Sequence, residues 1–191
     1  MRKLTTFVVV VLGAVFLIGG FGVPSYGEVW KDMDFPLVQG KVGILDKPDF
    51  DFTEHGYLFP QNDTSEILYL SRQLNHDYKY SSSSFPHLHY HQTTATAPTW
   101  KMDLRITENG TTPGGFATYT ATGSTFTYVS GTLLQIATWN AIDWSAIDTV
   151  SAIVDIKLYR DDNVVSGDVL AKSFDFHIQI DGPGSTLQYT K

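Results

Sequence analysis

The chain has 191 residues, of which 42% are hydrophobic, 14% aromatic and 17% charged. A chain of this length builds about one domain with its own core, and its aromatic content excludes a disordered protein. The formal net charge of −7 argues against binding nucleic acid, and the absence of cysteine excludes disulfides, thiol catalysis and cysteine-ligated zinc.

The first 27 residues have the layout of a secretory signal peptide. A short basic head precedes an uncharged apolar run at 7–18, and small residues stand at −3 and −1 of a cut before Glu28. An uncleaved membrane anchor is the alternative, because residues 5–23 carry no charge and are just long enough to span a bilayer. We therefore expect a secreted or virion-associated protein that meets a membrane only through residues 1–27, if these are not removed.

Residues 28–60 show no sustained hydrophobic period. They carry three prolines, several glycines and isolated aromatic residues, a composition that favours an extended N-terminal arm. The aromatic side chains of such an arm need burial, either on their own domain or on a neighbouring subunit. The predicted subunit interface contains five aromatic residues: Trp30, Phe35, Phe50, Phe52 and, from a later segment, Tyr90.

From residue 66 onward the sequence has the alternation of β-strands. Apolar and polar residues alternate most clearly in 100–107, 152–160 and 173–181, and residues 139–149 indicate a loop with one helical turn. About eight short strands predict an all-β domain, a jelly-roll-like antiparallel β-sandwich over residues 61–181 with a C-terminal tail at 182–191. The expected strands are 67–74, 87–94, 100–107, 116–122, 125–130, 132–139, 152–160 and 173–181.

His87, His89 and His91 form the clearest pattern of chemically active side chains. Alternate residues of a strand share one face, so the three imidazoles would lie about 6.5–7 Å apart and are the predicted ligands of a divalent transition metal. Within one chain, His177 is the expected additional ligand. In a homotrimer with its axis along this strand, each histidine would instead form a ring of three. Histidines that only line a solvent-exposed or subunit surface are the third interpretation.

Two other classes of function stay open as alternatives. A secreted cupin-like enzyme would hold its metal with His87, His89 and His177, although the glutamate that follows the second histidine in cupins is absent here. A carbohydrate-binding module would stack a sugar on Trp139 and Trp144. The sequence contains no nucleophile elbow, Walker loop or dinucleotide fingerprint, so we predict no catalytic residues and no organic cofactor.

Several short segments occur in a distinctive order, and one of them carries a Pro-His-x-His-aromatic motif. The segments are 30–32, 35–36, 58–63, 76–79, 85–90, 155–163 and 167–172. Together they resemble a family of small proteins from tailed-phage and prophage genomes, over most of residues 29–181. The resemblance implies an oligomeric virion structural component of the β-sandwich type. A signal-like N-terminus and residues 81–85 depart from that family.

These observations together predict a non-enzymatic structural or attachment protein. It would serve in a virion as a decoration, fibre or tail-associated component, or outside the cell as a filament or surface subunit. The expected partners are further copies of the chain, as a homotrimer, and other virion or surface proteins, but not nucleic acid.

Overall fold

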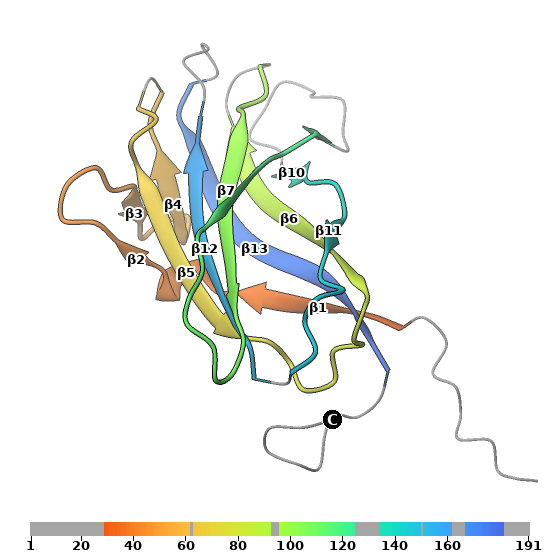
Figure 1. The fold of residues 1–191 in the computed structure, drawn as a ribbon. Coiled ribbons are helices and arrows are strands. Elements are labelled where there is room, and N and C mark those ends of the chain that lie inside the picture. The colour runs from red at the N-terminus through yellow and green to blue at the C-terminus, as the bar shows by residue number, and fades with distance from the viewer. Residues whose placement is uncertain are drawn as a thin grey trace, which may run out of the picture.

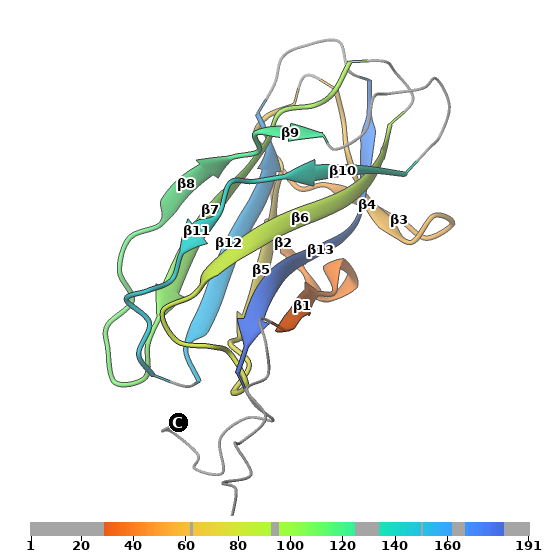
Figure 2. The same ribbon diagram turned by 90° about the vertical axis from the view of Figure 1, so that its right-hand side faces the viewer.

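A computed structural model describes residues 29–61, 63–92, 96–124, 134–149, 151–161 and 167–181. Within these ranges thirteen strands and one short 3₁₀ turn, η1 (Leu37–Gln39), form two antiparallel sheets that face each other across a shared core (Figures 1 and 2). Sheet A contains β1 (Val29–Phe35), β3 (Asp49–Asp51), β4 (Gly56–Phe59), β6 (Ser83–Gln92), β9 (Gly123–Ser124), β10 (Leu134–Thr138), β11 (Ile142–Asp143) and β13 (Val169–Ile180). Sheet B contains β2 (Lys41–Val42), β5 (Ile67–Gln73), β7 (Trp100–Thr107), β8 (Ala117–Thr120) and β12 (Ile153–Arg160).

The order of the strands is that of a jelly-roll-like sandwich. Sheet A runs β3-β4-β13-β6-β10-β9, and sheet B runs β2-β5-β12-β7-β8. The chain crosses between the sheets from β5 to β6, from β6 to β7 and from β12 to β13, so neighbours in space are mostly not neighbours in sequence. The predicted fold class is confirmed.

The inward-facing apolar side chains of the alternating strands fill the space between the sheets. On β12 the side chains of Val154, Ile156 and Leu158 point inward and are buried. On the facing sheet, Phe174 and Phe176 of β13 are also buried, with their rings 5.4 Å apart in an edge-to-face arrangement. The core is therefore built from the apolar face that each strand shows in the sequence.

β6 begins at Ser83, four residues before the predicted start, and it includes Pro86. Proline has no N–H for a ladder, so it is tolerated only where a neighbouring strand is interrupted. Here β11 pairs with Ser83 and Ser84 and β10 pairs from His87 onward, so Pro86 lies at the break between them. Its carbonyl still accepts a hydrogen bond from the Trp139 N–H at 3.3 Å.

The segment expected to be an extended arm lies inside the sandwich in its described part. β1 pairs with β13 in sheet A, β2 pairs with β5 in sheet B, and β3 and β4 return to sheet A, where β4 pairs with the first part of β13. Figure 2 shows β1 beside β13. The strands of this segment are two to seven residues long and belong to different sheets, so they show no common period in the sequence.

Two residues of the predicted subunit interface lie in the core of their own chain, which corrects that expectation. Phe35 is 2% exposed and packs on Phe174 and Phe176, and Tyr90 is 1% exposed with its ring 5.7 Å from that of Trp100. Burial raises the pKa of Tyr90 to about 12. By contrast, Trp30 and Phe52 are exposed and Phe50 is half-buried.

Three predicted segments lie outside the described residues: the leader 1–27, the strand 125–130 and the C-terminal tail 182–191. The described part of 139–149 contains the short strand β11 and a turn in which the Ile147 N–H donates to the Trp144 carbonyl at 2.9 Å. Among the residues that the structure describes, there is no helix of the length and apolar character needed to cross a membrane.

Candidate metal centre

The outer face of β6 carries the three histidines, as the alternation predicts. Leu88 and Tyr90 point into the core, whereas the side chains of His87, His89 and His91 lie on the opposite face and are partly exposed. Because side chains alternate along a strand, β6 contributes only this row of side chains to the outer face of the sheet. What the histidines can bind is therefore decided by the strands on either side of β6.

The pairing of β6 with β13 brings a second row of polar side chains to this face. Asp175 lies directly opposite His87, and His177 lies opposite Phe85, two pairs further along the ladder and on the same face of the sheet. On the other edge of β13, β1 places Asp32 opposite His177. Cross-strand and diagonal neighbours are close enough to interact, so three strands contribute to one group of imidazoles and carboxylates.

We call this group the histidine–aspartate cluster. Its centre consists of His87, Asp175 and His177, whose potential ligand atoms all lie within 4.8 Å of one another. Oδ1 of Asp175 is 3.5 Å from Nδ1 of His87 and 3.8 Å from Nε2 of His177, and the two imidazole rings are 4.2 Å apart. At the edge, Nε2 of His89 is 3.7 Å from Oδ2 of Asp175, and Nε2 of His177 is 2.7 Å from Oδ1 of Asp32.

Two atoms at the centre of the cluster are buried without a hydrogen-bond partner. They are Nδ1 of His87 and Oδ1 of Asp175, and the whole Asp175 residue is only 7% exposed. Leaving a buried polar atom unpaired costs about 1–3 kcal/mol, so native proteins keep such atoms mainly where a further ligand satisfies them. A cation between these two side chains would satisfy both atoms.

The chemistry of the cluster suits a divalent transition-metal ion. Imidazole nitrogen and carboxylate oxygen are ligands of zinc, and imidazole also binds copper, iron and nickel. Bond lengths of about 2.0–2.2 Å place the ligand atoms of a tetrahedral ion roughly 3.4 Å apart. The separations of 3.5 and 3.8 Å from Asp175 to the two imidazoles are close to this value. His89 and Asp32, at the edge of the cluster, are the candidates for a fourth ligand.

The structure brings together only part of the predicted ligand set. His87 and His177 meet at the centre and His89 lies at the edge, but His91 pairs with Leu134 on one side and Leu170 on the other and lies away from the cluster. Asp175 and Asp32 are not among the ligands that the sequence pattern predicted. Asp175 could have been found from the sequence, because it alternates with His177 and so lies on the same face of one strand. Asp32 could not, because the sequence of β1 does not have the pattern of a strand.

Trp139 and Trp144, the predicted sugar platform, are buried, which corrects that alternative. Trp139 is 4% exposed and its ring nitrogen donates to the carbonyl of Tyr119 at 3.2 Å. Trp144 is 1% exposed and lies against Tyr78 and Phe176, with ring centroids 5.7 and 5.2 Å away. Neither indole face is free to stack on a sugar, because both pack inside the sandwich.

Comparison with known proteins finds no matching family model and no matching curated protein. Fourteen chains of solved structure match. The family 36 carbohydrate-binding module in complex with calcium and xylotriose is 15% identical with a TM-score of 0.41, over 76% of this chain and 98% of that chain. The CBM22-1–GH10 modules of the Clostridium thermocellum xylanase 10B, complexed with xylohexaose, are 10% identical with a TM-score of 0.40, over 83% of this chain and 27% of theirs.

A phage protein is also among these structures. The enzymatically active domain of tailspike protein 4 from bacteriophage CBA120 is 10% identical with a TM-score of 0.36, over 78% of this chain and 19% of that chain. The similar structures thus include carbohydrate-binding modules and a tailspike domain.

Proposed function

We propose that this chain is a non-enzymatic structural or attachment domain that holds one divalent transition-metal ion in the histidine–aspartate cluster. One observation carries the proposal: His87, Asp175 and His177 converge within 4.8 Å, while the facing atoms of His87 and Asp175 are buried and unpartnered. The ion would satisfy both atoms at once.

The position of the cluster favours a structural role for the metal. Its side chains come from β6, β13 and β1, so a bound ion would tie the first described strand of the domain to the last one and to the centre of sheet A. With His89 or Asp32 as the fourth ligand the ion would have a closed coordination shell, which is typical of structural zinc, whereas catalytic zinc keeps an open position.

The same position argues against the cupin-like alternative. A metal that acts on an enclosed substrate would lie between the sheets, but here the imidazoles are on the outer face of sheet A. The space between the sheets is occupied at this level by Leu88, Phe174 and Phe176, each of which is fully buried. A substrate would therefore meet the metal only on an open sheet face.

Further support for a surface or virion role comes from the sequence. The signal-like residues 1–27 suit export, and the segments that resemble the tailed-phage family suit a virion component such as a decoration, fibre or tail-associated protein. In either setting copies of the chain associate with one another, as a homotrimer or a filament, and with other surface proteins. The domain acts by binding and assembly rather than by turnover.

The test is a titration of the purified, chelator-treated protein with Zn²⁺ by calorimetry, and with Co²⁺ by visible absorption. We expect one ion per chain and the intense absorption bands of tetrahedral cobalt. His87→Ala, His177→Ala and Asp175→Asn should each weaken binding at least tenfold. His91→Ala is the matched control, because it removes an imidazole from the same strand outside the cluster.

Two results would contradict the proposal. One is a chain that binds neither ion, and the other is binding that is lost in His91→Ala but retained in Asp175→Asn. Turnover that depends on the bound metal would instead restore the enzymatic alternative. Circular dichroism of each variant shows whether a loss of binding reflects a loss of folding.

A further inference from the structure

The turn between β3 and β4 presents an aromatic side chain to solvent. Phe52 is 82% exposed, and in the loop that precedes β3 the side chains of Ile44 and Leu45 are 96% and 78% exposed. Figure 2 shows this turn standing out from the body of the sandwich. A large ring exposed to this extent is a candidate for an interaction site.

The turn is held in one shape by local hydrogen bonds. Oδ1 of Asp51 accepts from the backbone N–H groups of Thr53 at 2.8 Å and Glu54 at 2.9 Å. These bonds lower the pKa of Asp51, with the bond from Glu54 contributing most. Lys172 of β13 donates to the carbonyl of Glu54 and so ties the turn to sheet A. The exposed ring therefore belongs to an ordered turn.

A row of aromatic rings connects Phe52 to the core. Its ring is 5.0 Å from that of Phe50, and the ring of Phe50 is 5.1 Å from that of Tyr57, with edge-to-face geometry in both pairs. Tyr57 is buried, Phe50 is half-buried and Phe52 is exposed. The row fixes the outermost ring in place, so docking it on a partner would cost little conformational entropy.

The surroundings of the exposed ring are acidic. Asp49 and Asp51 flank Phe50, Glu54 lies two residues after Phe52, and Asp46 lies in the preceding loop; the basic side chains nearby are Lys47 in that loop and Lys172, which is 3.5 Å from the Glu54 carboxylate. An acidic apolar turn is repelled by the anionic surface of a lipid bilayer. It suits instead a partner with an apolar floor and a cationic rim.

The outer side of sheet B offers such a surface in this chain. A hollow of about 370 Å³ is lined by Tyr69, Phe116, Lys41, Arg105 and Asp155, among others, and Asp155 is ion-paired with Arg105 at 2.7 Å, so that Lys41 contributes the charge in excess. The cation of Arg105 lies 4.5 Å and that of Lys157 lies 4.3 Å from the centre of the Phe116 ring. We call this hollow the cationic groove, since an aromatic floor and basic side chains line it together.

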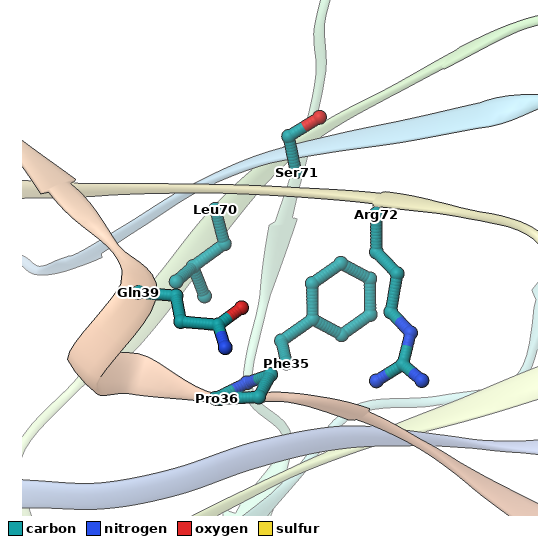
Figure 3. Close-up of a pocket in the computed structure, with 6 residues that line it drawn as sticks. All are labelled: Phe35, Pro36, Gln39, Leu70, Ser71 and Arg72. Carbon is teal, nitrogen blue, oxygen red and sulfur yellow. The ribbon is translucent and has the colours of Figure 1, made fainter.

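The cationic groove continues toward the edge of the sandwich. Gln39, Leu70 and Ser71 line both it and a second hollow of about 230 Å³, which lies between η1 and β5. Figure 3 shows the ring of Phe35 between Leu70 and Arg72 in this second hollow, with the amide of Gln39 turned toward it. The two hollows are therefore adjacent, with Gln39, Leu70 and Ser71 as their shared wall.

We propose that the Phe52 turn of one copy docks into the cationic groove of a second copy. The proposal rests on the proposed structural function, in which copies of the chain associate. The two surfaces differ and lie on different parts of the molecule, so the contact is head-to-tail: it closes into a ring, such as the predicted trimer, or continues as a filament. The acidic turn meets basic side chains, and apolar rings meet in the middle.

The test uses two variants that each destroy one side of the contact. Phe52→Ser removes the docking ring but keeps the groove, and Lys41→Glu reverses a charge at the groove but keeps the turn. Both side chains are exposed, so neither change should affect folding. Light scattering over a concentration series should show assemblies for the unchanged chain and monomers for each variant alone. An equimolar mixture of the two variants should form a heterodimer, because the intact turn of Lys41→Glu can still dock into the intact groove of Phe52→Ser.

Leu134→Ser is the matched control, since Leu134 is an exposed apolar residue on the outer face of sheet A. It should assemble like the unchanged chain. An unchanged chain that stays monomeric, a Phe52→Ser variant that still assembles, or a mixture of the two variants that stays monomeric would overturn the docking. Zinc titration of Phe52→Ser separates the two proposals, because the histidine–aspartate cluster should bind metal whether or not the copies associate.

Discussion

The outer face of each sheet carries an aspartate, and the two aspartates differ in their hydrogen-bond partners. On sheet B, Asp155 accepts hydrogen bonds from Arg105 at 2.7 and 3.1 Å and from the hydroxyl of Ser71 at 2.8 Å. On sheet A, Asp175 faces three imidazoles at 3.5–3.8 Å and keeps one oxygen without a hydrogen-bond partner. One carboxylate is satisfied within the protein, while the other has its neighbours at the spacing of metal ligands.

Asp155 and Asp175 show how the residues opposite a carboxylate decide whether a sheet face can acquire a binding site. A carboxylate beside a guanidinium is paired by charge-assisted hydrogen bonds and becomes part of the framework. The imidazoles beside Asp175 lie 3.5–3.8 Å from its oxygens, a spacing that a bridging cation would suit. The two aspartates differ because the residues opposite them differ. Changes to either sheet can test this difference.

The largest effect should come from metal on sheet A. Zinc at about one hundred times its Kd should stabilise the chain by about 2.7 kcal/mol, because only the folded cluster gathers the ligands. For a domain of this size that corresponds to a rise in Tm of about 5–10 °C. Differential scanning calorimetry should show this rise in the unchanged chain and none in Asp175→Asn. An equal rise in both would show that zinc binds elsewhere.

The next effect should come from breaking the pair on sheet B. Arg105→Met leaves Asp155 with the Ser71 hydroxyl alone, and we expect a loss of about 1 kcal/mol in the free energy of unfolding, since the pair is partly exposed. Urea denaturation measures this loss. The rise in Tm with zinc should stay unchanged in this variant, and its disappearance would contradict the separation of the two faces.

Glu66, which lies just before β5, should make the free energy of unfolding depend on pH, with an effect similar in size to that of Arg105→Met. Burial, followed by the nearby Asp63 and Asp49, raises the pKa of Glu66 from 4.5 to about 7. The folded chain therefore holds this proton more tightly than the unfolded chain does, and the stability it provides is lost as the pH rises from about 4.5 to 7.

Glu66→Gln keeps the group neutral at every pH. Its free energy of unfolding should match that of the unchanged chain near pH 4.5 and exceed it by about 1 kcal/mol at pH 8, a value reduced for partial exposure. Denaturation at both pH values checks this. A gain that is the same at both would assign the effect to the amide itself rather than to titration.

The smallest effect should come from His91. Its neighbours across the strands are Leu134 and Leu170, so His91→Ala should change the free energy of unfolding by less than about 0.5 kcal/mol. Its zinc affinity should stay within about twofold of the unchanged chain. A larger loss of zinc affinity would favour ligation along the single strand that carries His87, His89 and His91.

Local alternation was sufficient to predict much of the fold. It placed β7 at 100–107, where the structure has it, and it assigned the buried and outer faces of β12 and β13. It also separated His87, His89 and His91 from Leu88 and Tyr90, because the side chains of a strand alternate whatever lies beside it. Strands β1 to β4 escaped prediction because each is short and their partners lie in two different sheets.

The amino-acid sequence by itself therefore determined the class of fold and the face on which each histidine lies. Only the tertiary structure decided which carboxylate meets them. The pairing of β13 with β6 shifts register between Ala171 and Ser173, and beyond this irregularity Asp175 lies opposite His87. Such a register depends on the packing of the whole sheet rather than on neighbouring residues, so no local pattern could reveal it.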